Sequence, residues 1–426
     1  MIIHVVKPGE TVYEIARRYG VPMQKILDDN GLQKQDPLVV GQSLVIIPDN
    51  IRYIVQPGDT LYSIAKKYRI SVQQLAAANP QTTNPARISV GEVISVPTAD
   101  NITRSIDVNG YAYPNISEAT LNLTLPHLTY ISIFSYLVNA DGSLSEVADE
   151  QVIGTARASR VAPLMVITNI QDGKGFSSDI AHQILTDENV QNTLVADIIK
   201  TLENKNYYGL DVDFEYIYPY DRNSYTQFVR RMAETLRPLG YTVSVALAPK
   251  ISGTQQGLLY EAHDYGAIGR IADRIIIMTY EWGYTYGPPR AVSPVNEVER
   301  VLRYAVSVIP SRKILMGMPN YGYDWTLPYV PGTAARSLSN NAAVRLAAEV
   351  GAEIKYDETA KAPYYNYYDS EGKEHIVWFE DARSVKAKLD LVNKYNLGGI
   401  SVWTITSFFP QLWLVLSSMF GVNKVL

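Results

Sequence analysis

The sequence contains no cysteine in 426 residues. This absence excludes a disulfide scaffold, a zinc site built on thiolates and a cysteine nucleophile. Histidine is also scarce, and its positions do not show the spacing of metal ligands. We therefore expect neither a metal ion nor another cofactor. The histidines are His4, His127, His182, His263 and His375.

The chain has no large excess of charge of either sign, because it contains 43 acidic and 38 basic residues and its net charge is −5. No run of lysine and arginine is present, so we expect neither nucleic acid nor a membrane as a partner. No apolar run approaches the ~18 residues that span a bilayer. The first residues also lack the regions of an ordinary secretory signal, which predicts a soluble protein synthesised without a signal peptide.

An internal repeat occupies the first hundred residues of the chain. The segment 8–16, PGETVYEIA, recurs as PGDTLYSIA at 57–65. In each copy a threonine, Thr11 or Thr60, precedes apolar residues with helical spacing, so we expect both threonines to be N-caps. Apolar runs flank these helices. Each unit therefore reads as strand, helix, helix, strand, with expected limits of 1–49 and 51–98.

The two units resemble LysM modules. The resemblance depends on the shared start P-G-[DE]-T-x-x-x-I-A, the mid-unit asparagines Asn30 and Asn79, and the V-G, apolar strand and proline that close each unit. It implies binding to the N-acetylglucosamine backbone of peptidoglycan or chitin. Two weak sites on one polymer raise the overall affinity through avidity. The alternative is a pair of small units that only space the rest of the chain.

Three carboxylates alternate with apolar residues in the segment 209–215, GLDVDFE. A period of two places Asp211, Asp213 and Glu215 on one face of a β-strand, about 6 to 7 Å apart. Like charges at this spacing disfavour full ionisation, so at least one carboxyl should hold a proton near neutral pH. A protonated carboxyl beside an ionised one is the usual equipment for cleaving a glycosidic bond. The alternative, a polar strand with a solvated face, is disfavoured by the apolar flanks.

Residues 103–426 alternate apolar strands with amphipathic helices, which predicts a parallel α/β fold. Eight strand candidates favour a (β/α)8 TIM barrel. The Tyr-rich segment 353–379 predicts a small inserted β-rich element beside the cleft. Helices are expected at 189–204, 222–236 and 295–307. The expected strands are 106–113, 128–136, 164–168, 209–215, 242–247, 274–280, 313–318 and 399–403.

The carboxylate segment resembles the strand-four signature D-x-x-D-x-D-x-E of glycoside hydrolase family 18. Asp211, Asp213 and Glu215 match its last three acidic positions, and Tyr208 stands in place of the first. The segment 278–282, MTYEW, resembles the family motif M-x-Y-[DN]. The S-x-G-G motif of strand three is replaced by MVITN at 165–169. These departures indicate a divergent branch of the family.

The resemblance implies substrate-assisted catalysis with retention of configuration. Glu215 is the implied general acid, and Asp213 is expected to hold the acetamido N–H of the substrate. Asp211 would share a proton or charge from below, Tyr280 would bind the acetamido oxygen, and Trp403 would lie under the −1 sugar. The other expected substrate-binding residues are Glu281, Trp282, Asn320, Tyr323 and Trp325. The rings of Tyr323 and Trp325 could equally be part of the core.

Taken over its whole length, the chain resembles the spore cortex-lytic N-acetylglucosaminidases of endospore-forming bacteria. This implies a monomer in the bacterial spore coat or cortex that acts on peptidoglycan glycan strands or muropeptides. Two alternatives remain. One is a chitinase, which shares the mechanism, and the other is a non-catalytic chitinase-like protein that only binds glycans. The presence of both Asp213 and Glu215 disfavours the second.

Overall fold

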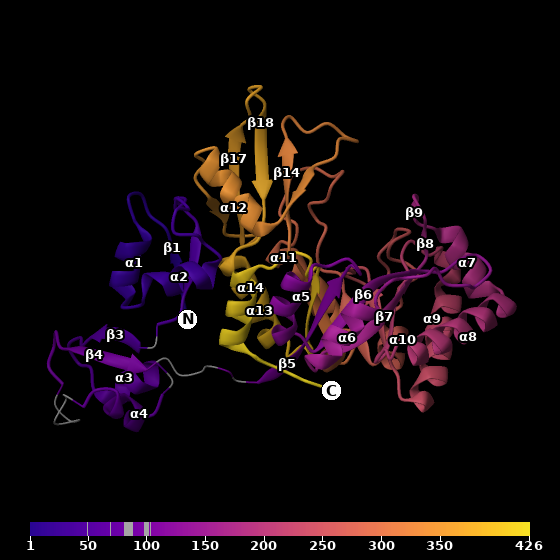
Figure 1. Ribbon diagram of the computed structural model, residues 1–426, viewed down its shortest axis with the longest axis horizontal. Helices are drawn as coiled ribbons and strands as arrows, with labels where there is room; N and C mark the ends of the chain where they lie inside the picture. The colour runs from indigo at the N-terminus through magenta and orange to yellow at the C-terminus, as the bar shows by residue number, and fades with distance from the viewer. Residues whose placement is uncertain (49, 69, 81–87, 98–101, 103) are drawn as a thin grey trace.

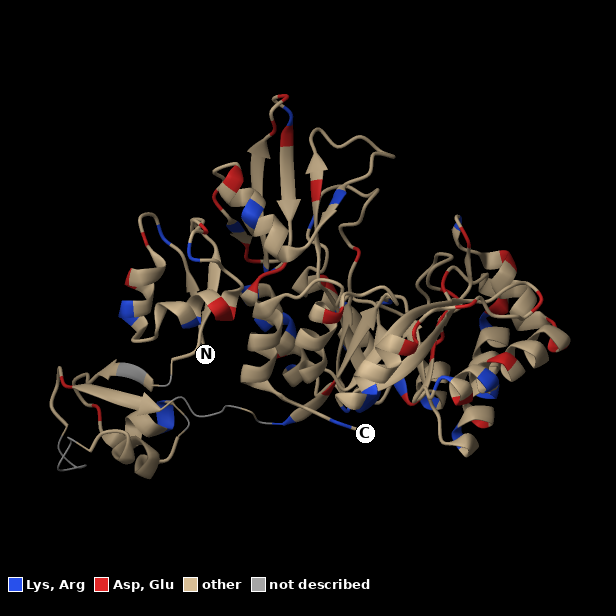
Figure 2. Cartoon of the chain, in the orientation of Figure 1, with Lys and Arg blue, Asp and Glu red and all other residues tan. Residues whose placement is uncertain are grey.

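The computed structural model describes residues 1–48, 50–68, 70–80, 88–97, 102 and 104–426 (Figure 1). Two small N-terminal modules precede a large barrel, and an inserted sheet projects from the barrel. Acidic and basic residues are interspersed over the modules, the inserted sheet and the barrel helices (Figure 2). The surface therefore follows the balanced composition of the sequence.

Each N-terminal module, in its described residues, pairs two antiparallel strands and places two helices against them. The predicted order of elements is confirmed. Thr11 and Thr60 cap the first helices as predicted, and each forms a reciprocal capping box with the residue three positions later. The elements are β1 (Ile2–Val5), α1 (Val12–Tyr19), α2 (Met23–Asn30), β2 (Ser43–Ile46), β3 (Asn50–Ile54), α3 (Leu61–Lys67), α4 (Val72–Ala77) and β4 (Val93–Pro97).

The repeated asparagine links the second helix of each module to its closing strand. Asn30 donates to the carbonyl of Val45 at 2.8 Å and accepts from the Val45 N–H at 2.7 Å. Asn79 makes the same pair of bonds to Ser95, at 2.6 and 2.7 Å. Both asparagines are buried. A buried amide must be hydrogen-bonded, so this exchange explains why the two copies share the residue.

Within residues 104–426, eight parallel strands close into a barrel through pairing of the first with the last. The predicted fold class is confirmed. The strands expected at 209–215 and 274–280 end earlier, at Asp213 and Ile277, so Glu215 and Tyr280 lie in the loops that follow. The strands are β5 (Ser105–Ala112), β6 (Tyr130–Leu137), β7 (Ala162–Thr168), β10 (Gly209–Asp213), β11 (Thr242–Leu247), β12 (Arg274–Ile277), β13 (Ile314–Pro319) and β19 (Gly399–Trp403).

Amphipathic helices surround the barrel. The apolar side chains of α9 recur every three or four residues from Tyr225 to Leu236 and are buried against the sheet. The helices expected at 189–204, 222–236 and 295–307 are confirmed within one residue. The helices are α5 (Glu118–Thr124), α6 (Glu150–Ala158), α7 (Ser178–Thr186), α8 (Glu188–Asn204), α9 (Arg222–Leu236), α10 (Tyr265–Ile271), α11 (Val295–Val308), α13 (Ala382–Lys394) and α14 (Pro410–Met419).

The insertion between β13 and β19 is larger than the segment 353–379 that the sequence suggested. Its sheet has the order β15-β14-β18-β17-β16 and already begins at Gly322, so Tyr323 and Trp325 belong to it. The expected hairpin turn at Gly372, with φ of 77°, joins β17 and β18. Its elements are β14 (Gly322–Thr326), β15 (Arg336–Leu338), α12 (Asn340–Glu349), β16 (Lys355–Asp357), β17 (Ala362–Tyr368) and β18 (Glu374–Trp378).

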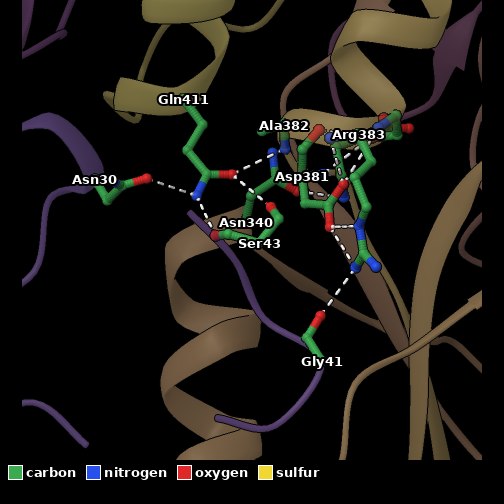
Figure 3. Close-up of polar contacts among 10 residues, drawn as sticks. Asn30, Gly41, Ser43, Asn340, Asp381, Ala382, Arg383 and Gln411 are labelled. Atoms are coloured by element: carbon green, nitrogen blue, oxygen red, sulfur yellow. Dashed lines mark hydrogen bonds and ion pairs between the residues drawn. The ribbon is translucent and has the colours of Figure 1, made fainter. Parts of the chain in front are cut away.

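The first module is packed against α13 and α14 of the barrel (Figures 1 and 3). The side-chain amide of Gln411 donates to Asn30 at 3.1 Å and to the carbonyl of Ser43 at 2.8 Å. Arg383 donates to the carbonyl of Gly41 at 3.0 Å. Val45 is part of the main barrel core. The first module is therefore joined to the barrel by both polar and apolar contacts.

Candidate active site

A cavity of about 620 Å³ lies at the carboxyl ends of the barrel strands. In a (β/α)8 barrel this end carries the chemistry. Most of the predicted site residues line it. These are Asp213, Glu215, Tyr280, Glu281, Trp282 and Trp403. The wall also contains residues without a predicted role, including Tyr111, Phe134, Tyr216, Tyr260, Tyr284, Glu297 and Arg300.

Asp211 lies beneath the cavity in the barrel interior and does not line it. Its carboxylate accepts hydrogen bonds from the hydroxyls of Tyr111 and Ser244, both at 2.6 Å, and from Ser132 at 3.3 Å. Burial raises the pKa of Asp211, and these hydrogen bonds act in the opposite direction. The three donors come from three different strands, so Asp211 is fixed by the closure of the barrel.

Asp213 is buried at the base of the cavity. Its Oδ1 atom has no hydrogen-bond partner among the described residues. The pKa of Asp213 is raised well above its usual value, first by burial and then by the charges of Glu215 and Asp211. The like charges that the sequence predicts therefore raise this pKa less than burial does. An unpaired carboxylate oxygen at a cavity wall is available to accept a hydrogen bond from a ligand.

Glu215 is held by the side chain of the residue that follows the neighbouring strand β7. Its backbone N–H donates to Oδ1 of Asn169 at 2.9 Å, and its carbonyl accepts from Nδ2 of Asn169 at 2.8 Å. The pKa of Glu215 is raised to about 7, first by burial and then by the charge of Glu281. The carboxyl can therefore both give and take a proton near neutral pH. In the sequence, Asn169 is distinguished only as part of the segment that replaces the S-x-G-G motif.

His263 also holds the segment that follows β10, through the carbonyl of Phe214. Its Nδ1 accepts from the N–H of Ala248 at 2.9 Å, so Nε2 carries the hydrogen that it donates to the carbonyl of Phe214 at 3.0 Å. Burial lowers the pKa of His263 to about 4, which keeps the ring neutral. Because its neighbours in sequence are not its contacts, no local motif indicated this role.

Glu281 follows β12 with a positive φ of 65°. The hydroxyls of Tyr321 and Tyr323 donate to its carboxylate. Burial raises the pKa of Glu281 and the two tyrosine hydrogen bonds lower it. Tyr323 is not among the residues that line the cavity, but its hydroxyl bonds to Glu281, which does line it. Direct contact of Tyr323 with substrate stays a prediction.

Asn320 and Trp325 are also not among the residues that line the cavity, and their predicted contact with substrate stays a prediction. Asn320 donates to the carbonyls of Thr404 at 2.8 Å and Ser407 at 2.7 Å, and so holds the loop that follows β19. Trp325 is buried in the inserted sheet and donates to the carbonyl of Gly287 at 2.9 Å. For Trp325 the core alternative is the one that the structure supports.

Aromatic packing orients Tyr280 and Trp403. The ring of Trp403 makes edge contacts with Phe134 at 4.9 Å and Tyr111 at 5.3 Å between centroids. Tyr280 depends on a glycine, because a Cβ at Gly317 would lie 2.8 Å from the Tyr280 ring and 2.6 Å from a backbone carbonyl. Both rings are therefore fixed before any ligand enters.

Tyr208 replaces the first acidic residue of the family signature. It precedes β10 and therefore lies at the amino end of the strand, away from the cavity. Its ring packs near Tyr130, with centroids 6.1 Å apart. The replacement leaves the chemistry of Asp213 and Glu215 untouched.

In the part of the chain that the structure describes, no group of three or more His, Cys, Asp or Glu side chains is arranged to hold a metal ion. No helix in the same described residues has the length and apolar character needed to cross a membrane.

The barrel, its cavity and the carboxylates at its base define a glycoside hydrolase. The family model of glycosyl hydrolases family 18 matches residues 109–407, and the LysM domain model matches residues 4–46 and 53–97. The chain belongs to glycosyl hydrolase family 18, and it carries two LysM domains before the catalytic barrel.

Two similar proteins match this chain over its whole length, and a third matches about three quarters of it. The cortical fragment-lytic enzyme of Bacillus subtilis is 42% identical over 431 residues, covering 100% of this chain and 99% of that protein. The crystal structure of the spore cortex-lytic enzyme SleL of Bacillus megaterium matches with a TM-score of 0.92 and 39% identity, covering 100% and 99% of the chains. A chitinase of Chromobacterium violaceum matches with a TM-score of 0.68 and 28% identity, covering 74% of this chain and 98% of that chain. The predicted resemblance to cortex-lytic enzymes is confirmed.

Proposed function

We propose that the protein is a retaining N-acetylglucosaminidase that hydrolyses spore cortex peptidoglycan, or its fragments, after N-acetylglucosamine during germination. One observation carries the proposal. A glutamate with a pKa of about 7, Glu215, lies in the same cavity as Asp213, whose Oδ1 has no partner among the described residues. Full-length similarity to cortical fragment-lytic enzymes supports the choice of substrate.

In the first step the protonated Glu215 donates its proton to the glycosidic oxygen, and the bond to the leaving sugar breaks. The acetamido oxygen of the substrate attacks the anomeric carbon and forms an oxazolinium ion. Oδ1 of Asp213 accepts the acetamido N–H and balances the positive charge that develops. The hydroxyl of Tyr280 donates to the acetamido oxygen and keeps it in line for attack.

In the second step Glu215, now a carboxylate, removes a proton from a water molecule that attacks the anomeric carbon. The oxazolinium ring opens and the configuration of the sugar is retained. A group that gives a proton and later takes one works best with a pKa near the working pH, which the pKa of about 7 supports. Asp211 lies beneath Asp213, and its negative charge helps to raise the pKa of Asp213.

The remaining cavity residues would bind the sugars. Trp403 offers an apolar face for the sugar above Asp213, and Trp282 and Glu281 line the wall beside it. The two LysM domains would hold the enzyme on the polymer in the coat or cortex of the spore. The protein would act as a monomer, because one chain carries both the LysM domains and the catalytic cavity. We propose domain limits of 1–49, 51–98 and 103–426, in line with the matched ranges.

A digestion experiment tests the proposal. Purified spore cortex and its soluble fragments are incubated with the enzyme, and the new reducing ends are identified by mass spectrometry. New N-acetylglucosamine reducing ends are expected, with faster cleavage of muropeptides than of chitin oligomers. Cleavage of chitin oligomers alone would instead favour a chitinase. The chitinase of Chromobacterium violaceum is 28% identical to this chain over the matched part. Absence of cleavage in both would favour a glycan-binding protein.

A further inference from the structure

One cation faces the catalytic cavity among its described lining residues, and it is Arg300. The other charged residues of the wall are acidic. Arg300 lies in α11, and its guanidinium contacts Glu297 at 2.7 Å. The Arg300 side chain is 53% exposed, so its ion pair with Glu297 is not buried in the core. A guanidinium has five N–H donors, and a single carboxylate leaves several of them free.

A shallow groove, wide open to solvent, adjoins the cavity at α11. It has a volume of about 340 Å³ and is lined by Ile251, Arg300, Arg303 and Tyr304. Two of these, Ile251 and Arg300, also line the catalytic cavity, so the two spaces adjoin. A ligand that fills the cavity can therefore extend a substituent into this groove.

Arg303 provides a second guanidinium in the groove. Its side chain is 69% exposed, and its ion pair with Glu299 is long, at 3.8 Å. Glu299 is engaged more closely by Lys394 at 2.5 Å and by the hydroxyl of Tyr395 at 2.8 Å. The charge of Arg303 is therefore only weakly compensated within the chain. The groove presents two neighbouring cations, one held by Glu297 and one largely free.

We propose that this groove binds a carboxylate carried by the muramic acid next to the N-acetylglucosamine over Asp213. The inference rests on the proposed function, because it assumes a peptidoglycan substrate. The carboxylate belongs either to the lactyl group of muramic acid or to the peptide attached to it. A planar guanidinium binds a carboxylate through two parallel hydrogen bonds. Chitin has no carboxylate, so the groove favours peptidoglycan over chitin.

The expected effect is moderate, because both side chains are exposed and water and salt screen their charges. Arg300→Gln or Arg303→Gln should lower the preference for a carboxylate-bearing substrate about threefold to tenfold, and the double variant should lower it further. Glu297→Gln should have the opposite effect, since it frees the Arg300 guanidinium for the ligand. Raising the salt concentration should weaken the preference of the parent enzyme and leave that of the double variant nearly constant.

The experiment compares kcat/KM on three soluble substrates with the full-length protein. The first is an N-acetylglucosamine tetramer, the second a peptide-free glycan tetrasaccharide with free lactyl carboxyls, and the third the same glycan with its peptides. Arg230→Gln, an exposed charge change on α9 outside both cavities, is the matched control. Thermal unfolding of each variant checks that the fold is intact.

A fall in preference for the second substrate assigns the lactyl carboxylate, and a fall for the third alone assigns the peptide carboxylates. If both arginine variants keep the preference of the parent, the inference is overturned while the proposed function stands. If the parent enzyme cleaves neither glycan faster than the N-acetylglucosamine tetramer, the proposed function itself fails. The two failures are therefore distinguishable.

Discussion

Asn169 bonds to the backbone of Glu215 through both polar atoms of its amide, accepting at 2.9 Å and donating at 2.8 Å. The acid lies two residues beyond the end of β10, where no ladder hydrogen bonds hold the chain. The residue that directly follows the neighbouring strand β7 thus supplies the support that β10 lacks. The position of the acid depends on the two strands together.

Removing this support should impair chemistry more than binding. Asn169→Ala leaves the N–H and carbonyl of Glu215 without their partners, and we expect kcat to fall about tenfold to a hundredfold with little change in KM. The free energy of unfolding should decrease by about 1–3 kcal/mol. Steady-state kinetics and urea unfolding measure the two effects. Asn139→Ala, in an exposed loop, is the control, and a normal kcat in Asn169→Ala would remove the positioning role.

The pH profile should report the coupling between Glu215 and Glu281. Catalysis needs protonated Glu215, so kcat/KM should decline above a pH of about 7. Glu281→Gln removes a negative charge that raises the pKa of Glu215, so the decline should move to lower pH. A profile with an unmoved basic limb would mean that the charge of Glu281 does not reach the acid. The profile of Glu203→Gln, an exposed charge change on α8 outside the cavity, serves as the control.

The contact between the first module and the barrel should contribute to stability. Gln411 is buried and makes hydrogen bonds to Asn30, to Ser43 and to the N–H of Ala382. Gln411→Ala leaves these groups unpaired, which should reduce the free energy of unfolding by about 1–3 kcal/mol. Gln24→Ala, on the exposed face of α2, should change it by less than about 0.5 kcal/mol. Equal effects would show that the interface adds no stability.

The second module should serve binding to the polymer and not the chemistry. It has a core of its own, made by Val55, Leu61, Ile64, Leu75 and Ile94 among others. Its removal, with residues 49–103 replaced by a flexible linker, should reduce pelleting with insoluble cortex and leave kcat/KM on soluble fragments unchanged. Loss of activity on the fragments would mean that this module completes the catalytic cavity.

Local patterns in the sequence predicted the capping threonines, the eight strands and the residues of the carboxylate stack, because periodicity and caps are encoded by neighbouring residues. The supports of that stack could not be predicted. Ser132 and Ser244 come from other strands, and Asn169 directly follows β7; they contact Asp211 or Glu215 only when the barrel closes. No local sequence pattern predicts these contacts.

Other features also need the whole fold. Alternation in the inserted sheet shows which residues share a face and not which face borders the cavity, so the sequence alone does not show that Trp325 is buried in the sheet. The order of causes for the raised pKa of Asp213 also needed the structure, since burial depends on the whole fold. The docking of the first module, through Gln411, joins residues far apart in the chain.

The central claim is that Glu215 is the proton donor, and the most direct test is the rate of Glu215→Gln on soluble muropeptides. The amide keeps the shape of the side chain and cannot donate the proton, so kcat should fall by about 10²- to 10⁴-fold. Binding of the fragments and thermal unfolding should match the parent, and Glu203→Gln on the exposed face of α8 should keep full activity. A Glu215→Gln variant with kcat within about threefold of the parent would contradict the account.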